Sequence, residues 1–577
     1  MKKFLYILIA LTSPLYNYAQ NVGNDEDATE IVTNAKREVE PASRILSAPK
    51  MIDTVVNYKV VEYPMLPVRY ETTIKMEPIL PANVKLSENK MLKLYNGYVR
   101  AGIGSTFMPL GEIYYNNTRS RKYVWGANIK HLSSYGELKG YAPANFDRTH
   151  YNAFGGIKQL NYSLLGDVHF NNYGVNRYGV EKPNASKDSI SQRFKEIGGQ
   201  VKFLSHKMDS LKLNYVMQLD VYNLKDKKPS DAAFANYFGN ENNIALTTNF
   251  WYRKGNTKYA ADVNVFNNHF VYGDAGGKMN ALDTAIDYKN TIVELKPLFT
   301  SYALGNKLKV QYGGDINLIF DKTTTFAGYI IADVKYAMFD NVLIPYVGVK
   351  GGVKQNTFKT LSEQNAFMQS NPTLKNESTP YNAYLGIKGI LTKQMEFNAF
   401  ASYSEVRNKA LFVSDSSALH RNRNQFNVIY DTMQIFMAEA SLSYQLDEKI
   451  KIDGIGRFYN YLAKNNSYAW NLPVYQFIVR GNYVLNNKFI FSLDVNGEGG
   501  RRALVYDSLE ANTGIEDGQI NKKLGLIVDA NIGVEYRYTR RISAFLQCNN
   551  VAAQQYFRWY KYPVQSFQVL GGVTFKF

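Results

Sequence analysis

Along most of this 577-residue chain, apolar and polar side chains alternate with a period of two, from about residue 97 to the last residue. Such alternation points successive side chains to opposite faces of a β-sheet. Clear examples lie at 162–170, 211–222 and 524–538. The last of these runs for 15 residues, from Leu524 to Tyr538. Soluble strands usually have about five or six residues, whereas a tilted membrane-crossing strand needs about 9–11. The pattern therefore favours a transmembrane β-barrel.

The connectors between these runs alternate between tight turns and long polar segments. Tight turns are expected at Gly305-Asn306, Asp340-Asn341, Asn486-Asn487 and Thr539-Arg540-Arg541, because these residues tolerate turn geometry. Long connectors are expected at 135–148, 174–190, 225–239, 271–285, 354–379, 406–424, 497–522 and 549–565. Short turns on one rim and long loops on the other are typical of outer-membrane barrels, with the short side periplasmic.

The number of alternating segments predicts the size of the barrel. Their centres lie near residues 101, 114, 128, 153, 166, 199, 216, 246, 263, 294, 312, 331, 347, 385, 400, 439, 455, 478, 491, 531, 545 and 572. We therefore predict an all-β, antiparallel transmembrane barrel of about 22 strands, within a range of 20 to 24. An even number places both ends of the barrel at the periplasmic rim.

The first residues indicate export. Lys2 and Lys3 precede an apolar segment, and small residues then lead to Gln20, which is the order of a secretory signal peptide. We predict a signal peptide over 1–19, an extended N-terminal segment over 20–93 and an outer-membrane barrel over 94–577. The barrel pattern and the signal together place the protein in the bacterial outer membrane.

Composition excludes several other classes. The chain has 45% hydrophobic residues, 14% aromatic residues and a mean hydropathy of −0.32. We find no apolar run near the roughly 18 residues that a helical span needs, so a helical membrane protein is excluded. A single cysteine, Cys548, excludes a disulfide framework.

The net charge is +17, and most of it lies in the barrel region. Residues 94–577 hold 55 basic and 39 acidic residues, a net charge of +16. We find no basic helix or zinc-finger spacing, so we predict no nucleic-acid partner. Attraction to anionic lipid headgroups, including lipopolysaccharide, or to anionic solutes is the expected consequence.

Candidate chemistry is sparse, and we predict no catalytic, cofactor-binding or metal-binding residues and no enzyme activity. The six histidines are scattered without metal-binding spacing. His169 and Asp167 are expected to face the lumen together as ordinary lining. Two loop motifs, Gly497–Gly500 with Arg501-Arg502 and His420–Arg423, could bind an anion, but we interpret both as flexible extracellular loops. Cys548 is interpreted as a small strand residue.

The C-terminal residues carry a family resemblance. The stretches Gln547–Val551, Tyr556–Tyr560, Tyr562-Pro563 and Gly571–Phe577 resemble the end of TonB-dependent receptor barrels. The aromatic content and the Ala19-Gln20 boundary are similar to those of Bacteroidetes outer-membrane proteins. The resemblance implies a 22-strand barrel of a transporter. A terminal aromatic residue after an alternating strand also implies recognition by the outer-membrane insertion machinery.

The N-terminal part departs from that family. About 73 residues separate Gln20 from the first strand, which is too few for the family's plug domain of well over 100 residues. Pro64, Pro67, Pro78 and Pro81 indicate an extended stretch instead. Asp53–Val56 looks only superficially like a TonB box. We therefore expect a barrel that lacks a plug domain.

Two functions of different classes follow. The first is a channel or transporter-like barrel for solutes, with a hydrophilic lumen that loops, the 20–93 segment or a partner would fill. The alternative is a structural or accessory barrel in a multi-protein outer-membrane assembly or secretion complex, with 20–93 as a periplasmic handle. The barrel would then have a periplasmic or surface protein partner.

Overall fold

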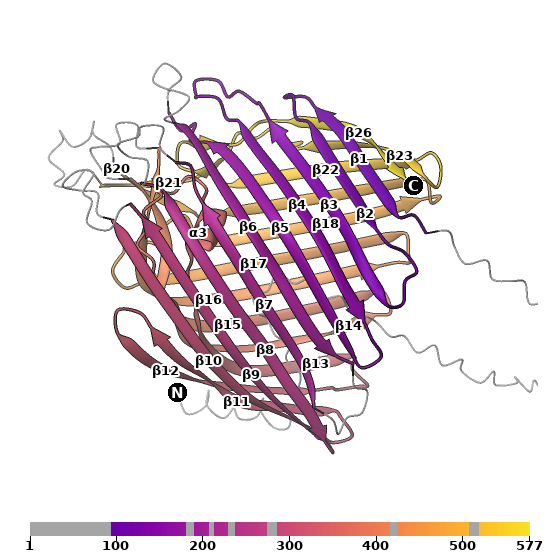
Figure 1. Ribbon diagram of the computed structural model, residues 1–577, viewed down its shortest axis with the longest axis vertical. Coiled ribbons are helices and arrows are strands. Elements are labelled where there is room, and N and C mark those ends of the chain that lie inside the picture. Colours follow the sequence, from indigo (N-terminus) through magenta and orange to yellow (C-terminus); the bar gives the residue numbers. More distant parts are fainter. Residues whose placement is uncertain are drawn as a thin grey trace, which may run out of the picture. The chain divides into compact units, whose positions relative to one another are not determined.

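The computed structural model describes residues 94–180, 190–206, 213–228, 237–273, 285–415, 424–506 and 519–577. Within these residues, 22 antiparallel strands form one sheet that closes on itself (Figure 1). Closure is direct, because β1 (Gly97–Gly104) pairs with β26 (Gln568–Lys576) on one side and with β2 (Leu110–Asn116) on the other. The predicted fold class and the predicted strand number are confirmed.

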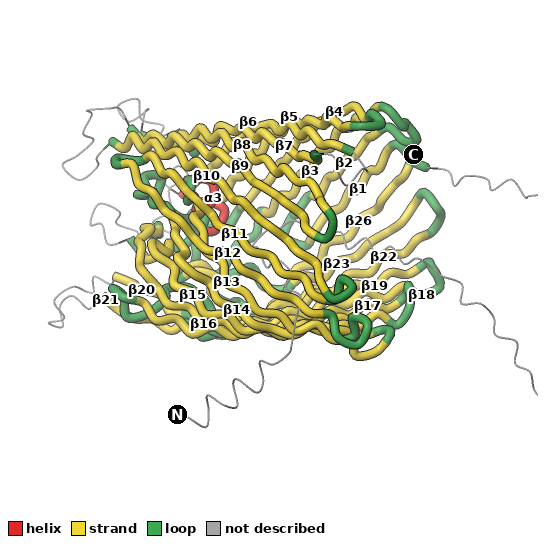
Figure 2. The backbone as a smooth tube through the Cα atoms, turned by 90° about the horizontal axis from the view of Figure 1, so that it is seen from below, coloured by secondary structure: helices red, strands yellow, loops and turns green. Residues whose placement is uncertain are grey.

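The other barrel strands follow in chain order around the ring (Figure 2). They are β3 (Tyr123–Ser134), β4 (Phe146–Lys158), β5 (Tyr162–Asn176), β6 (Ser191–Ser205), β7 (Asn214–Lys225), β8 (Gly239–Lys254), β9 (Thr257–Tyr272), β10 (Ile286–Ala303), β11 (Leu308–Phe320), β12 (Thr324–Tyr336), β13 (Leu343–Lys354), β14 (Glu377–Thr392), β15 (Met395–Ser414), β16 (Phe426–Gln445), β17 (Ile450–Ala463), β18 (Tyr475–Leu485), β19 (Phe489–Gly499), β22 (Ile527–Arg537) and β23 (Ile542–Asn549). Each predicted centre falls inside one of the 22 strands.

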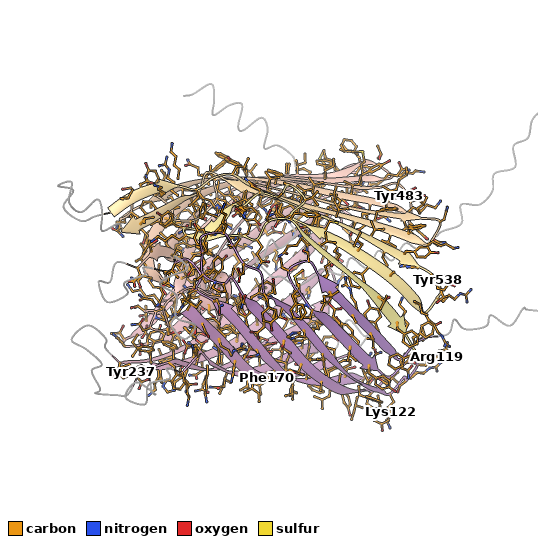
Figure 3. All side chains as sticks on the ribbon, turned by 90° about the horizontal axis from the view of Figure 1, so that it is seen from above. Arg119, Lys122, Phe170, Tyr237, Tyr483 and Tyr538 are labelled. Atoms are coloured by element: carbon orange, nitrogen blue, oxygen red, sulfur yellow. The ribbon has the colours of Figure 1, made fainter. Side chains whose placement is uncertain are left out.

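The two faces of the sheet have opposite character. On β7, Leu219 and Val221 are 40% and 42% exposed and face outward, whereas Gln218 Nε2 donates to Asp220 Oδ2 on the inner face. On β5, Phe170 projects from the outer surface (Figure 3). Because an outward apolar band and a polar interior are what a lipid-embedded barrel requires, the fold is that of a transmembrane barrel.

Short turns gather at one end of the barrel, which we call the short-turn rim. It comprises the turns 117–122, 159–161, 255–256, 304–307, 337–342, 393–394, 446–449, 486–488 and 538–541. Asn306, Asp340 and Asn487 have positive φ there, a conformation that Asn and Asp adopt more readily than most residues. In Figure 3, Arg119, Lys122 and Tyr538 mark this rim, and Tyr237 lies at the opposite end.

The opposite end, which we call the long-loop rim, holds the long connectors. These include the 355–376 connector with helix α3 (Phe358–Gln364), and two hairpins that are separate from the barrel sheet, β20 (Arg502–Tyr506) with β21 (Gln519–Lys523) and β24 (Phe557–Trp559) with β25 (Tyr562–Pro563). Two connectors at this rim, 105–109 and 321–323, are short. No helix in the described ranges is long and apolar enough to span a membrane.

One predicted strand is shorter than expected. The pattern at 524–538 predicts 15 residues on one strand, but β22 covers Ile527–Arg537 and has 11. Leu524 instead packs in a small cluster with Ala503 and Val505 of the β20–β21 hairpin. Leu524 therefore continues the alternation without belonging to the strand. The predicted signal peptide over 1–19, the segment 20–93 and the TonB-box candidate lie outside the described residues.

Candidate functional site

Several connectors of the long-loop rim converge on one another, and we call the group formed by residues 177–180, 355–376, 424–425 and 550–567 the loop cap. Arg177 Nη2 donates to the carbonyl oxygen of Met368 at 3.0 Å. The amide of Asn424 donates to the carbonyl oxygen of Arg177 at 2.9 Å, and the hydroxyl of Tyr562 donates to the carbonyl oxygen of Asn424. Three hydrogen bonds thus connect four connectors that are far apart in sequence.

Aromatic side chains form the centre of the loop cap. The rings of Phe367 and Tyr562 stack with centroids 3.8 Å apart, and Tyr178 meets Tyr562 edge to face at 4.9 Å. The Tyr178 hydroxyl also donates to the carbonyl oxygen of Pro563 at 2.9 Å. Tyr562 is 1% exposed, and burial raises the pKa of its hydroxyl, so the hydroxyl stays a hydrogen-bond donor.

Helix α3 attaches the loop cap to one wall of the barrel. Thr357 caps the helix by accepting from the backbone N–H of Thr360, in a reciprocal capping box. The carboxyl group of Glu241 on β8 accepts from the backbone N–H groups of Phe358 at 2.7 Å and Lys359 at 2.9 Å. Because the first N–H groups of a helix have no partner within it, a wall side chain that accepts from them fixes the helix in place.

The side chains of α3 continue this attachment into the lumen. The Phe358 ring is fully buried against Phe270 of β9, with centroids 5.0 Å apart. Lys359 Nζ lies 2.7 Å from Glu196 Oε1 on β6, and His169 Nε2 lies 3.0 Å from the same oxygen. α3 therefore combines an apolar and a polar contact with the β5–β9 wall.

The β24–β25 hairpin connects the loop cap to the wall of the barrel across the lumen from β5–β9. The Trp559 ring lies 5.3 Å from Phe412 of β15 and 5.5 Å from Phe426 of β16. Phe412, Phe426, Tyr562 and Phe358 belong to one continuous buried cluster. The loop cap therefore spans the lumen at the long-loop rim, from the β5–β9 wall to the β15–β16 wall.

A buried carboxyl group lies where the loop cap meets the wall. Asp226, just after β7, accepts from the backbone N–H of Gly239 at 2.8 Å and from Gln192 Nε2 at 3.4 Å. Gln192 Nε2 also lies 3.5 Å from Ser370 Oγ in the loop cap. Burial raises the pKa of Asp226 to about 7, against the hydrogen bonds and Arg177, which act in the opposite direction.

Below the loop cap, the inner wall is lined with polar side chains, many of them in ion pairs. Arg457 Nε lies 2.6 Å from Glu439 Oε2 between β17 and β16. Lys296 Nζ lies 2.7 Å from Glu294 Oε1 on β10 and 3.5 Å from Asp315 Oδ2 on β11. Such a wall is compatible with water and polar solutes in the lumen.

A cavity of about 310 Å³ lies beside the loop cap. Its lining combines aromatic and apolar side chains with amides and one carboxylate, contributed by Ala144, Phe146, Tyr173, Val175, Tyr178, Phe367, Asp529, Asn531, Asn549, Asn550, Tyr556, Val564, Gln565 and Gln568. Many of these polar groups already bond to each other: Tyr556 donates to Asp529 Oδ2 at 2.9 Å, and Asn531 Oδ1 accepts from the backbone of Asn550 at 2.9 Å. The cavity therefore lies within the contact between the loop cap and the barrel wall.

The structure shows where most of the residues singled out from the sequence lie. His169 and Asp167 do face the lumen together, with His169 Nδ1 3.5 Å from Asp167 Oδ2. Arg501 is buried, and its guanidinium donates to the carbonyl oxygens of Arg558 and Phe557, both at 2.7 Å. That side chain therefore holds a loop together. Cys548 is a strand residue of β23 opposite Ile532, and His420–Arg423 lies outside the described residues.

No cluster of three or more histidine, cysteine, aspartate or glutamate side chains suited to a metal ion lies within the described ranges. Three residues matter most for the loop cap, Glu241, Arg177 and Tyr562. Glu241 and Arg177 were not singled out from the sequence, and Tyr562 was named only as part of the C-terminal resemblance. Thr357 followed by Phe358 and Leu361 at helical spacing is the one local signal that would have indicated α3. The other contacts join segments more than 100 residues apart.

Comparison with known proteins identifies the fold. No protein-family model and no curated protein sequence matches this chain. Among solved structures, the FrpB iron transporter from Neisseria meningitidis has a TM-score of 0.63 at 9% identity, covering 84% of this chain and 82% of its own. The pyoverdine outer membrane receptor FpvA from Pseudomonas aeruginosa has a TM-score of 0.60 at 12% identity, covering 84% and 78%. The ferric-catecholate import receptor Fiu from Escherichia coli K12 has a TM-score of 0.58 at 11% identity, covering 84% and 82%. At these identities the likeness concerns the fold of the barrel.

Proposed function

We propose that this protein is a solute-transport barrel of the bacterial outer membrane, with the long-loop rim outside the cell and the short-turn rim in the periplasm. In this proposal the loop cap is the outer gate of the lumen. The observation that supports it most strongly is the chain of contacts from Glu241 through α3 and Tyr562 to Phe412, which crosses the mouth of the barrel.

Two further observations support transport. The inner wall is polar and rich in ion pairs, whereas the outer face carries exposed apolar side chains such as Leu385 and Ile330. The structures with the same fold are described as an iron transporter, a pyoverdine receptor and a ferric-catecholate import receptor. Each of these descriptions concerns uptake or binding, so we propose a role in transport and no enzyme activity.

In this proposal the protein is exported, inserted into the outer membrane and surrounded there by lipid. The 1–19 segment would direct export as a signal peptide. The closing strand β26 would be read by the outer-membrane insertion machinery, because it alternates and is followed by Phe577, which is 48% exposed. Lipids and lipopolysaccharide would surround the outward apolar band. The 20–93 segment stays predicted as periplasmic or lumen-associated, without a plug domain.

Liposome swelling separates the transport function from the structural alternative. The full-length protein is reconstituted and tested with uncharged sugars of increasing size, alongside Tyr562→Ala, which removes the centre of the loop cap, and Tyr538→Ala, which alters an exposed turn residue. We expect slow swelling for wild type and Tyr538→Ala and faster swelling for Tyr562→Ala. Equal swelling rates for all three proteins would contradict a gate and favour a structural barrel in an assembly.

A further inference from the structure

The inner wall near the short-turn rim carries a group of positive side chains, which we call the basic patch: Arg253, Lys258, Lys309, Lys335 and Lys388. They lie on β8, β9, β11, β12 and β14. The direction of the Lys309 side chain follows from a neighbour on β11. Tyr312, three positions away, is 50% exposed and faces outward. Alternation along the strand therefore places Lys309 on the inner face.

Cross-strand register brings these cations together. Arg253 is directly opposite Lys258, and Lys309 is directly opposite Lys335. Side chains in such positions have Cβ atoms about 4.5–5.5 Å apart, and like charges placed there are destabilising. Two like-charge pairs on one stretch of the wall lower the stability of the folded barrel. Such an arrangement indicates a functional role for these cations.

Tyr302 joins the two pairs. The Arg253 guanidinium lies 5.2 Å from the centre of the Tyr302 ring, and Tyr302 is directly opposite Lys309. Lys258 Nζ in turn lies 5.3 Å from the Trp251 ring. These aromatic faces orient the cations by cation–π attraction without neutralising their charge.

The carboxylates nearby are fewer than the cations. Asp333 lies within the patch, where its Oδ1 is 3.1 Å from Lys335 Nζ and its Oδ2 accepts from the Tyr384 hydroxyl at 2.8 Å. Asp262 and Glu396 lie at the edges, toward Lys258 and Lys388. Five cations therefore face three carboxylates, and the excess is positive.

Other cations of the inner wall lie directly beside carboxylates. Arg457 pairs with Glu439 at 2.6 Å, and Arg480 pairs with Asp494 at 3.1 Å. The basic patch differs from these pairs because its cations oppose one another across strands. A concave surface lined by one sign of charge concentrates ions of the opposite sign.

We propose that the basic patch is a binding site for a compact oxyanion with two or more negative charges, such as a phosphate or a polycarboxylate. The ammonium group of Lys309 would contact the anion as a point charge, and the Arg253 guanidinium would offer paired N–H donors. Lys335 is 5% exposed and paired with Asp333, so it would add positive charge behind the site without touching the anion. All residues of the site lie on barrel strands, so anion binding there does not depend on whether the loop cap opens.

Calorimetric titration of the full-length protein in detergent with inorganic phosphate tests this site at low ionic strength. We expect saturable binding to wild type, and a loss of affinity of about tenfold or more in Lys309→Gln and in Arg253→Gln, because each removes one charge-assisted contact. Arg480→Gln is the matched control, since it removes an inner-wall cation from a balanced pair, and its phosphate affinity should equal that of wild type.

Thermal unfolding of the same proteins provides a second readout. Lys309→Gln relieves a like-charge pair, so it should fold and should unfold at a higher temperature than wild type without phosphate. Added phosphate should raise the unfolding temperature of wild type and Arg480→Gln by binding the folded state, and raise that of Lys309→Gln much less. Absence of saturable phosphate binding to wild type, or equal affinity in all four proteins, would overturn the proposal.

Discussion

The hydroxyl of Tyr562 donates a hydrogen bond to the backbone carbonyl of Asn424, although 138 residues separate them in the chain. Asn424 in turn donates to Arg177, 247 residues away. A connector from the β5–β9 wall, a connector from the β15–β16 wall and the β24–β25 hairpin thereby become a single unit. The loop cap is therefore held together by its own contacts, in addition to its contacts with the barrel wall.

Substitutions of Tyr562 should loosen the loop cap in two steps. Tyr562→Phe keeps the ring and leaves the Asn424 carbonyl without its donor, which should cost about 1–3 kcal/mol. Tyr562→Ala also removes the stacked ring and should cost about 3–5 kcal/mol. Hydrogen exchange of residues 355–376 measures the opening of the cap. Equal exchange in wild type and Tyr562→Ala would mean that Tyr562 does not hold the cap closed.

Removing the wall anchor of α3 should have a local effect. Glu241→Ala leaves the N–H groups of Phe358 and Lys359 without their acceptor, which should weaken the attachment of the helix by about 1.5–3 kcal/mol. Glu241→Gln keeps one acceptor oxygen and should have a smaller effect. Limited proteolysis within 355–376 reports the change, and Glu448→Ala, in a turn at the short-turn rim, should leave the cleavage rate unaltered.

The loop cap should be more stable in acid than above neutral pH. The folded protein holds the Asp226 proton up to about pH 7, whereas an unfolded aspartate loses it near pH 4, so the folded state binds more protons in between. Stability of the cap should fall as pH rises from about 4 to 7, by at most about 1.4 kcal/mol per unit, and then level off. Hydrogen exchange corrected for intrinsic rates checks this. Asp226→Asn should remove the dependence, and a dependence that persists in Asp226→Asn would assign it to another group.

Two adjacent residues of β23 test the assignment of faces. Leu546 is 47% exposed on the outer face, and the next residue, Gln547, faces the lumen. Leu546→Arg places a charge against lipid and should cost about 2–4 kcal/mol, whereas Gln547→Arg should change stability by less than about 1 kcal/mol. Urea unfolding in liposomes measures both. Similar costs at the two positions would contradict the orientation of this strand.

The barrel itself could be predicted from the sequence because its information is local. Alternation fixes the faces, and turn residues such as Asn306 and Asn487 fix the strand ends, so all 22 strands follow. The loop cap could not be predicted in this way. Glu241 and Phe358 are 117 residues apart, and nothing in the period of either segment indicates that they meet. The prediction that Leu524 belongs to the strand at 524–538 is wrong for the same reason. Leu524 continues the alternation of β22 but packs against the β20–β21 hairpin.

Single-channel recording in planar bilayers tests the central claim, that the loop cap gates a polar lumen, most directly. Full-length wild type should show small or rare openings, because the cap spans the lumen at the long-loop rim. The double variant Glu241→Ala, Tyr562→Ala releases the cap from one wall and from its own centre, so it should show frequent openings of several-fold larger conductance. A double variant that is folded, inserted and as silent as wild type would contradict the claim.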